Sequence, residues 1–213
     1  MQRALAGLYA VTPDEARTDV LVLKVKQALA GGAAAVQYRN KAAGSQLKLE
    51  QGRALAALCA AAGAIFIVND DVALALELDA DGVHLGAEDG DLADARQRLG
   101  PGRLLGASCY DRIDLAAAAV RAGADHLAFG SVFSSPTKPG AVRAPLALFA
   151  EARRRFTLPL VAIGGINLQN APEAFAAGAD AVAVISAVFE VDDVAGHAAA
   201  FTRIYQQQRM QQQ

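Results

Sequence analysis

Short apolar runs alternate with longer segments of helical periodicity along almost the whole chain. Several of the short runs have no polar alternation, which is typical of strands that are buried on both faces. Glycine follows many of the longer segments, as expected where a helix ends with a positive φ. The predicted strands are residues 5–11, 33–38, 64–68, 82–85, 104–107, 126–130, 160–163 and 181–185. Helices are expected between them, for example at residues 19–30, 45–62, 112–122 and 146–156.

Regular alternation of strand and helix indicates repeated βα units and therefore the α/β class. Eight such units fit a single-domain (β/α)8 TIM barrel better than an open doubly wound sheet, although counting alone leaves the open sheet as an alternative. The barrel is expected to span residues 1–205, and the glutamine-rich residues 206–213 are predicted to form a disordered tail. Asp81, Asp125 and Asp180 each precede a predicted strand after small residues, so one helix-to-strand turn is reused for a structural purpose.

Composition narrows the classes of function. Hydrophobic residues make up 54% of the chain, yet no apolar stretch approaches bilayer length and the N-terminus lacks the layout of a signal peptide. The 20 Lys and Arg nearly balance the 22 Asp and Glu, which disfavours a nucleic-acid or membrane partner. Cys59 and Cys109 have no CxxC spacing and are read as reduced, packed thiols. We therefore expect a cytoplasmic protein with small-molecule ligands; a homo-oligomer is compatible with the sequence.

Cationic side chains follow the second predicted strand. Gln37, Arg39 and Lys41 alternate along the chain, so they are expected to leave the same face of the strand end. The carboxyl ends of barrel strands are where reactive residues collect, and an arginine fork beside a lysine charge suits a polyphosphate. The alternative is a pair of solvated charges at an exposed strand end.

Carboxylates follow the third and fourth predicted strands, at Asp70 and Asp89. Two carboxylates that face one cleft repel each other unless a proton or a cation lies between them. Mg²⁺, held by one or two carboxylates and by phosphate oxygens, would satisfy both. The alternative is helix N-capping, by Asp70 or Asp71 for one helix and by Asp89 or Asp91 for the next.

A second anion site is expected on the other side of the barrel mouth. Gly164 and Gly165 follow the seventh strand and Ser186 follows the eighth, where barrels often bind phosphate through backbone amides. Residues 134–138 form a hydroxyl-rich loop that ends at Lys138 and lies between the two anion sites in chain order. This arrangement predicts two anionic groups in one site.

The histidines do not point to acid–base catalysis. His84, His126 and His197 are each interpreted as structural, and no nucleophile–base pair is evident in the sequence. That pattern disfavours acyl transfer and leaves electrostatic stabilisation and metal assistance as the catalytic resources.

Six motifs together resemble the thiamine phosphate synthase/TenI barrel family, over residues 8–189. They are QYRNK at 37–41, VNDD at 68–71, DGVHLG at 81–86 with Asp89, GSVF at 130–133 through Lys138, AIGGI at 162–166 and VISA at 184–187. The resemblance implies condensation of 4-amino-2-methyl-5-hydroxymethylpyrimidine diphosphate with a (carboxy)thiazole phosphate, giving thiamine phosphate and diphosphate with the help of Mg²⁺.

Site residues follow from the same resemblance, position by position. Arg39, Lys41 and Lys138 would be catalytic, and Asp70 and Asp89 would bind magnesium. The pyrimidine diphosphate would be held by Gln37, Arg39, Lys41, Asn69, Ser108 and Lys138, and the thiazole phosphate by Ser135, Thr137, Gly165, Ile185 and Ser186.

The chain departs from the family pattern at a few positions. Tyr38 and Asn40 stand where leucine and glutamate are commoner, and Ala87 stands where glutamine is frequent. Ser134 and Ser135 replace the usual proline and threonine. None of these changes removes an expected cation or metal ligand.

Three other functions are compatible with parts of the pattern. A TenI-like thiazole phosphate tautomerase would need no diphosphate clamp, and a non-catalytic sensor would bind diphosphate without releasing it. A sugar-phosphate isomerase or epimerase would share the Gly164 and Gly165 site but would need an acid–base pair.

Overall fold

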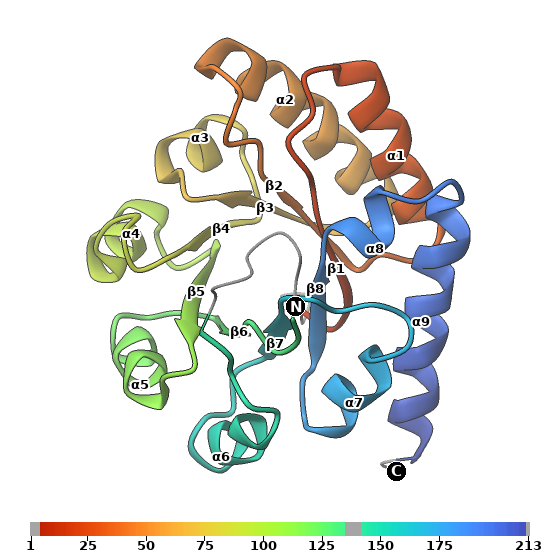
Figure 1. The fold of residues 1–213 in the computed structure, drawn as a ribbon. Coiled ribbons are helices and arrows are strands. Elements are labelled where there is room, and N and C mark those ends of the chain that lie inside the picture. Colours follow the sequence, from red (N-terminus) through yellow and green to blue (C-terminus); the bar gives the residue numbers. More distant parts are fainter. Residues whose placement is uncertain (1–4, 135–141, 212–213) are drawn as a thin grey trace.

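The computed structural model describes residues 5–134 and 142–211. Within them, eight parallel strands close into one barrel in chain order, with helices around it (Figure 1), which confirms the (β/α)8 prediction. The strands are β1 (Gly7–Val11), β2 (Ala35–Tyr38), β3 (Ile65–Asn69), β4 (Gly82–Leu85), β5 (Leu104–Tyr110), β6 (His126–Gly130), β7 (Leu160–Ile163) and β8 (Ala181–Val184). The helices are α1 (Thr18–Ala30), α2 (Ser45–Ala62), α3 (Val72–Glu77), α4 (Leu92–Leu99), α5 (Ile113–Arg121), α6 (Ala147–Arg155), α7 (Ala171–Ala176), α8 (Ser186–Phe189) and α9 (Val194–Gln211).

Alternation along each strand divides the apolar residues into two cores. In β3, Ile65 and Ile67 belong to a cluster inside the barrel, whereas Phe66 and Val68 belong to a larger cluster between the strands and the helices. Both faces of the strand are therefore buried, which explains why the apolar runs of the sequence lack polar alternation.

The helix-to-strand turns before β4, β6 and β8 each contain an aspartate, and the three aspartates make the same kind of hydrogen bond. Asp81, Asp125 and Asp180 each accept a hydrogen bond from a backbone N–H near the start of the preceding strand, namely Phe66, Leu105 and Leu160, at 2.7 to 2.8 Å. Arg96 of α4 also pairs with Asp125, and Arg153 of α6 pairs with Asp180. These carboxylates join neighbouring strands at the amino-terminal end of the barrel, away from the predicted site.

The C-terminal segment differs from the expectation of a disordered tail. Helix α9 continues through Gln211, so residues 206–211 are helical. Glutamine is a good helix former, and the helix is anchored upstream where Ala198 and Phe201 are fully buried. In Figure 1, α9 lies beside α1 and α7 on the outside of the barrel, and it packs against both helices.

Candidate active site

The segment after β2 is held by the loop that follows β1. The Thr12 hydroxyl donates to the Arg39 carbonyl oxygen at 2.7 Å, and the Arg39 N–H donates back to the Thr12 oxygen at 2.8 Å. Asp14 accepts from the Lys41 backbone N–H at 2.6 Å and pairs with the Arg39 guanidinium at 3.2 Å. The two cations expected to bind phosphate are thus positioned by polar groups of the first βα loop.

A buried polar network lies behind this segment. Gln51 of α2 accepts hydrogen bonds from the Tyr38 hydroxyl at 2.9 Å and the Asn40 amide at 3.0 Å. The amide groups of Gln51 and Asn40 both donate to the carbonyl oxygen of Glu15, at 2.8 and 2.7 Å. Tyr38 and Asn40 are therefore connected to each other through Gln51.

Lys41 and two carboxylates converge at the ends of β2, β3 and β4. The Lys41 ammonium lies 3.2 Å from a carboxylate oxygen of Asp70. Burial and a hydrogen bond with Asp89 raise the pKa of Asp70, and Lys41 opposes this shift. Asp89 also accepts from the Gly86 N–H at 2.8 Å. The raised pKa of Asp70 is the effect expected of two carboxylates that share one cleft.

Helix capping is performed by the neighbouring aspartates. Asp71 accepts from the Leu74 N–H at the start of α3, and Asp91 accepts from the Asp94 N–H at the start of α4, each at 2.9 Å. Asp70 instead has a φ of 63°, an uncommon conformation for a residue other than glycine. The structure thus leaves Asp70 and Asp89 free of the capping role.

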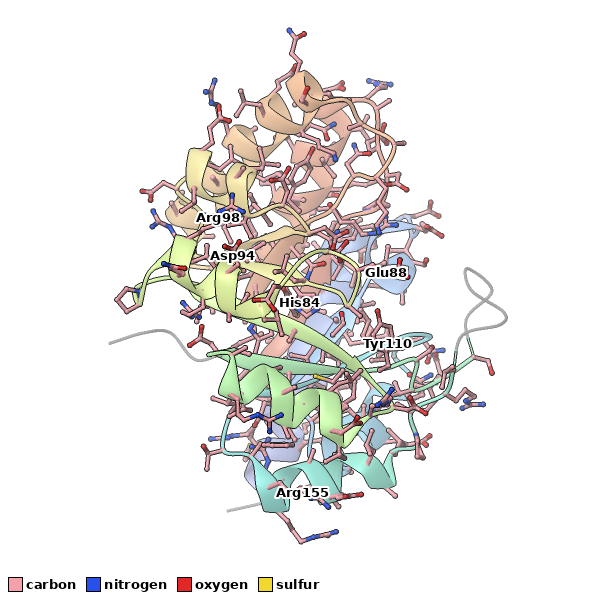
Figure 2. All side chains as sticks on the ribbon, turned by 90° about the vertical axis from the view of Figure 1, so that its left-hand side faces the viewer. His84, Glu88, Asp94, Arg98, Tyr110 and Arg155 are labelled. Atoms are coloured by element: carbon pink, nitrogen blue, oxygen red, sulfur yellow. The ribbon has the colours of Figure 1, made fainter. Side chains whose placement is uncertain are left out.

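A cleft of about 390 Å³ opens beside these carboxylates. Its lining includes Lys41, Asn69, Asp70 and Asp89, together with Lys48 and Arg98. In Figure 2 the arrow of β5 points to the side where Glu88 and Tyr110 lie, which is therefore the end of the barrel with the βα loops.

Gln37 and Ser108, two further residues predicted for the pyrimidine site, lie on the inner face of the barrel. Gln37 is 5% exposed and donates to the Tyr9 hydroxyl at 2.8 Å. Ser108 of β5 lies 3.0 Å from Nε2 of His84, whose Nδ1 lies 3.2 Å from Nε2 of His126. Figure 2 places His84 nearer the middle of the barrel than Glu88 and Tyr110.

Burial sets the charge state of these two imidazoles. It lowers the pKa of His84 to about 4, and it lowers the pKa of His126 as well. Both rings are therefore neutral near pH 7. Nδ1 of His126 is buried without a hydrogen-bond partner in the described part of the chain.

The loops after β6 and β7 are paired with each other. Phe133 N–H donates to the Gly164 carbonyl oxygen at 3.0 Å, and the side chain of Asn170 donates to the Gly165 carbonyl oxygen at 3.0 Å. Gly165 has a φ of 65°, and a Cβ there would lie 2.4 Å from the backbone oxygen of Ser134. Glycine is required here by both conformation and space.

Comparison with known proteins assigns the chain to a family. The family model described as thiamine monophosphate synthase matches residues 8–188. The chain belongs to this family. It is 54% identical over 201 residues to a thiamine-phosphate synthase of Aromatoleum aromaticum, covering 94% of this chain and 97% of that protein. It is 55% identical over 191 residues to the synthase of Thioalkalivibrio sulfidiphilus, covering 89% and 90%.

A solved structure agrees in both fold and sequence. The thiamine phosphate pyrophosphorylase of Pyrococcus furiosus superposes with a TM-score of 0.85 at 38% identity, covering 95% of this chain and 96% of that one. The match extends over nearly the full length of both chains, so the barrel fold is shared.

The structure brings together some of the residues expected from the family. Lys41, Asp70 and Asp89 form one group, whereas Arg39 pairs with Asp14 on the other side of the β2 end. Arg39 and Lys41 follow β2 rather than extend it, because the strand ends at Tyr38. Ile185 and Ser186 stand at the start of α8, immediately after β8. Ser135, Thr137 and Lys138 lie outside the described residues.

Sequence reasoning assigned no function to several residues that hold the segments around the candidate site. Thr12, Asp14 and Gln51 hold the segment after β2, and each acts through the backbone or through another side chain. Arg143 donates to the Val132 carbonyl oxygen at 3.2 Å beside the loop after β6. Thr12 could have been found from the sequence, because it directly follows the first predicted strand. No sequence pattern pointed to Asp14, Gln51 or Arg143.

The carboxylates of Asp70 and Asp89 fit a magnesium ion whose coordination shell is completed by oxygens of the bound phosphate ligand. Asp70 and Asp89 are hard oxygen donors, and the nearby Asp89 helps to raise the pKa of Asp70, so a cation between them would relieve their repulsion. No cluster of three or more His, Cys, Asp or Glu side chains suited to a metal occurs in residues 5–134 and 142–211. Mg²⁺ commonly takes one or two carboxylates and completes its shell with phosphate and water.

Among the helices described, none is both long enough and apolar enough to span a lipid bilayer.

Proposed function

We propose that this protein is a transferase that condenses 4-amino-2-methyl-5-hydroxymethylpyrimidine diphosphate with a (carboxy)thiazole phosphate. The products are thiamine phosphate and diphosphate, together with CO2 where the thiazole substrate carries a carboxylate. Family membership supports the reaction, and relatives with 54% and 55% identity carry the name thiamine-phosphate synthase. The convergence of Lys41, Asp70 and Asp89 beside the cleft is the structural observation that carries the proposal.

The pyrimidine diphosphate is assigned to the half of the mouth formed by β2 to β5. Lys41 and Arg39 supply positive charge there, and Asn69 and Ser108 supply neutral hydrogen-bonding groups. Lys138 joins them on the strength of its motif position. Gln37, buried deeper against Tyr9, suits the uncharged heterocycle better than the phosphates.

Asp70 and Asp89 would hold Mg²⁺. When bound, the ion would supply positive charge to the diphosphate oxygens. Lys41 would then exchange its contact with Asp70 for a phosphate oxygen, because the ion takes over the carboxylate. Gly86 would keep Asp89 oriented through its backbone N–H.

The chemistry needs leaving-group stabilisation rather than a general base. The bond between the pyrimidine methylene carbon and the diphosphate oxygen breaks with its electron pair leaving on oxygen. The thiazole nitrogen then donates its lone pair to the carbon. Lys41, Arg39 and Lys138 stabilise the departing negative charge, and each ~1.4 kcal/mol of extra stabilisation accelerates the step about tenfold.

The thiazole phosphate is assigned to the opposite half of the mouth. Gly165 and the start of α8 at Ser186 offer backbone N–H groups at the position where barrels often bind phosphate. Ile185, together with Ser135 and Thr137, completes this half by motif position. Two anionic groups on opposite sides of one mouth would bring the methylene carbon and the thiazole nitrogen together.

Incubation of the purified chain with both phosphorylated heterocycles, with and without Mg²⁺, tests the reaction. We expect stoichiometric thiamine phosphate and diphosphate only when both heterocycles and the metal are present. Isomerisation of the thiazole without the pyrimidine would instead indicate a tautomerase. Binding of the pyrimidine diphosphate without release of diphosphate would indicate a sensor.

A matched pair of aspartate variants tests the site. Asp89→Ala removes the carboxylate assigned to the metal and should lower kcat/KM by about 100-fold or more. Asp91→Ala, two residues away, removes a helix cap and should cost about 1 kcal/mol of stability with activity retained. Lys138→Ala should lose activity as Asp89→Ala does. Equal activity of the two aspartate variants would contradict the metal assignment.

A further inference from the structure

Three polar side chains form a hydrogen-bonded chain inside the barrel. Nε2 of His126 lies 3.2 Å from Nδ1 of His84, and Nε2 of His84 lies 3.0 Å from the hydroxyl oxygen of Ser108. The two ring planes are inclined by 27° with centroids 5.4 Å apart, and His126 is 1% exposed and His84 7% exposed. They come from β6 and β4, and Ser108 belongs to β5 between them.

The absence of a side chain at Gly106 makes room for the imidazoles of His84 and His126. A Cβ at that position would lie 2.1 Å from Nε2 of His126 and 2.4 Å from Nδ1 of His84. Gly106 has no positive φ, so close approach of the imidazoles is what requires glycine. The barrel interior is therefore shaped around the pair, at a depth where an apolar filling would be the simpler solution.

Only two proton arrangements are compatible with two neutral rings and these contacts. In the first, His126 carries its proton on Nδ1, His84 donates from Nδ1 to His126, and Ser108 donates to Nε2 of His84. In the second, His126 donates from Nε2 to His84, and His84 donates from Nε2 to Ser108. In the first arrangement, the Ser108 hydroxyl donates its proton to His84. In the second, Ser108 accepts from His84, and its hydroxyl proton is available to another acceptor.

The surroundings of His126 distinguish between the two arrangements. Its Nδ1 is buried and has no hydrogen-bond partner in residues 5–134 and 142–211. The first arrangement would leave an N–H unpaired there, whereas the second leaves only a lone pair. Buried unpaired N–H groups are the rarer of the two in proteins.

We propose that His126 and His84 form a positioning relay that makes Ser108 an acceptor on its inner side and so directs its hydroxyl proton toward the ligand. Ser108 is half-buried at the carboxyl end of β5, so its hydroxyl reaches the edge of the barrel mouth. A phosphate oxygen of the pyrimidine diphosphate is the acceptor with the matching chemistry. This role rests on the proposed function, in which Ser108 binds that substrate.

Nitrogen-15 NMR of the histidine rings tests the relay directly in the intact protein. The chain has three histidines, and a His197→Gln variant assigns the remaining two ring systems by elimination. We expect both His84 and His126 to be neutral with the proton on Nε2. A proton on Nδ1 of His84 would overturn the proposal, whether or not any variant folds.

A double-mutant cycle tests whether His84 acts through Ser108. Ser108→Ala and His84→Leu should each raise KM for the pyrimidine diphosphate about tenfold or more, the effect of one charge-assisted hydrogen bond. The double variant should be no worse than either single variant. His84→Gln, which can offer an amide N–H toward Ser108, should recover much of the loss. Multiplicative losses in the double variant would overturn the relay.

Failure of the relay is distinguishable from failure of the proposed function. If the wild-type protein makes no thiamine phosphate, the proposed function fails while the NMR measurement still decides the proton arrangement. If the protein is active but Ser108→Ala leaves KM unchanged, the relay to the substrate is wrong and the reaction assignment stands.

Discussion

Asp70 and Asp71 are adjacent in the sequence, but they differ in backbone conformation and their carboxylates make different contacts. Asp71 has an extended conformation that turns its carboxylate onto the first turn of α3. Asp70 has a positive φ, and its carboxylate meets Lys41 and Asp89. The strained conformation is therefore located at the residue whose orientation the proposed chemistry requires, as is common at functional sites.

The raised pKa of Asp70 predicts how removal of the Asp70 carboxylate changes the free energy of unfolding. The folded protein holds this proton more tightly than the unfolded chain, so ionisation above the unfolded pKa of about 3.9 costs stability. In metal-free buffer, Asp70→Asn should thus have a larger free energy of unfolding than wild type at pH 7, and the gain should shrink as the pH falls to 4. Urea denaturation at both pH values measures it.

The pH dependence separates this electrostatic effect from a conformational one. Asparagine tolerates a positive φ well, but that benefit is the same at both pH values. A stability difference between wild type and Asp70→Asn that does not change from pH 7 to pH 4 would contradict the electrostatic account.

Gly106 predicts the cost of disturbing the buried histidines. In Gly106→Ala the new methyl group would overlap both imidazoles, so we expect a loss of about 1–3 kcal/mol, as for other overpacked cores. Gly102→Ala is the control, because a Cβ there meets nothing within 4 Å. Urea denaturation should show a loss for the first variant and little change for the second. Equal stabilities would mean that the barrel interior adapts easily.

At the scale of elements, the amino-terminal end of the barrel uses carboxylates to bind backbone. Asp125 illustrates this use, since it accepts from the Leu105 N–H, pairs with Arg96 and is 33% exposed at its side chain. Each odd-numbered strand from β3 to β7 receives such a contact near its start. These contacts lie at the end of the barrel opposite the proposed site, so they affect stability without touching substrate.

Asp125→Ala should therefore lower stability and spare catalysis. Loss of the acceptor leaves the Leu105 N–H unpaired at a part-buried position, which costs about 1–3 kcal/mol. Asp114→Ala removes an exposed ion pair with Arg112, which water screens, and should change stability much less than Asp125→Ala. Denaturation curves measure the difference, and kcat/KM for both variants should match wild type. A fall in kcat/KM for Asp125→Ala would contradict the separation of the two ends.

The elements were predictable from the sequence because their signals are local. Short, largely apolar runs predicted strands such as residues 82–85 and 160–163 at their observed bounds. The His84–His126 contact was not predictable, because strand register across β4, β5 and β6 brings together residues 42 positions apart. Likewise, choosing Asp71 over Asp70 as the cap depends on backbone dihedral angles that residue type does not determine.

At the scale of the whole molecule, ligand binding at one end of the barrel should be measurable as global stability. The proposed site joins loops that follow β2, β3 and β4, which lie far apart in the sequence but adjacent in the barrel. A ligand that bridges these loops binds only the folded state. It therefore stabilises the entire fold by mass action.

Inorganic diphosphate with Mg²⁺ should raise the melting temperature of the wild-type protein. At a ligand concentration about 100 times Kd, the gain is about 2.7 kcal/mol, or roughly 5–11 °C for a domain of this size. Lys41→Met should reduce the shift, since it removes a cation from the cleft. Asp89→Ala should abolish the part that depends on Mg²⁺, while Asp91→Ala should keep it. Differential scanning calorimetry measures all four proteins. A full magnesium-dependent shift in Asp89→Ala would show that the ion binds elsewhere, because Asp89 interacts with Asp70 whereas Asp91 caps α4.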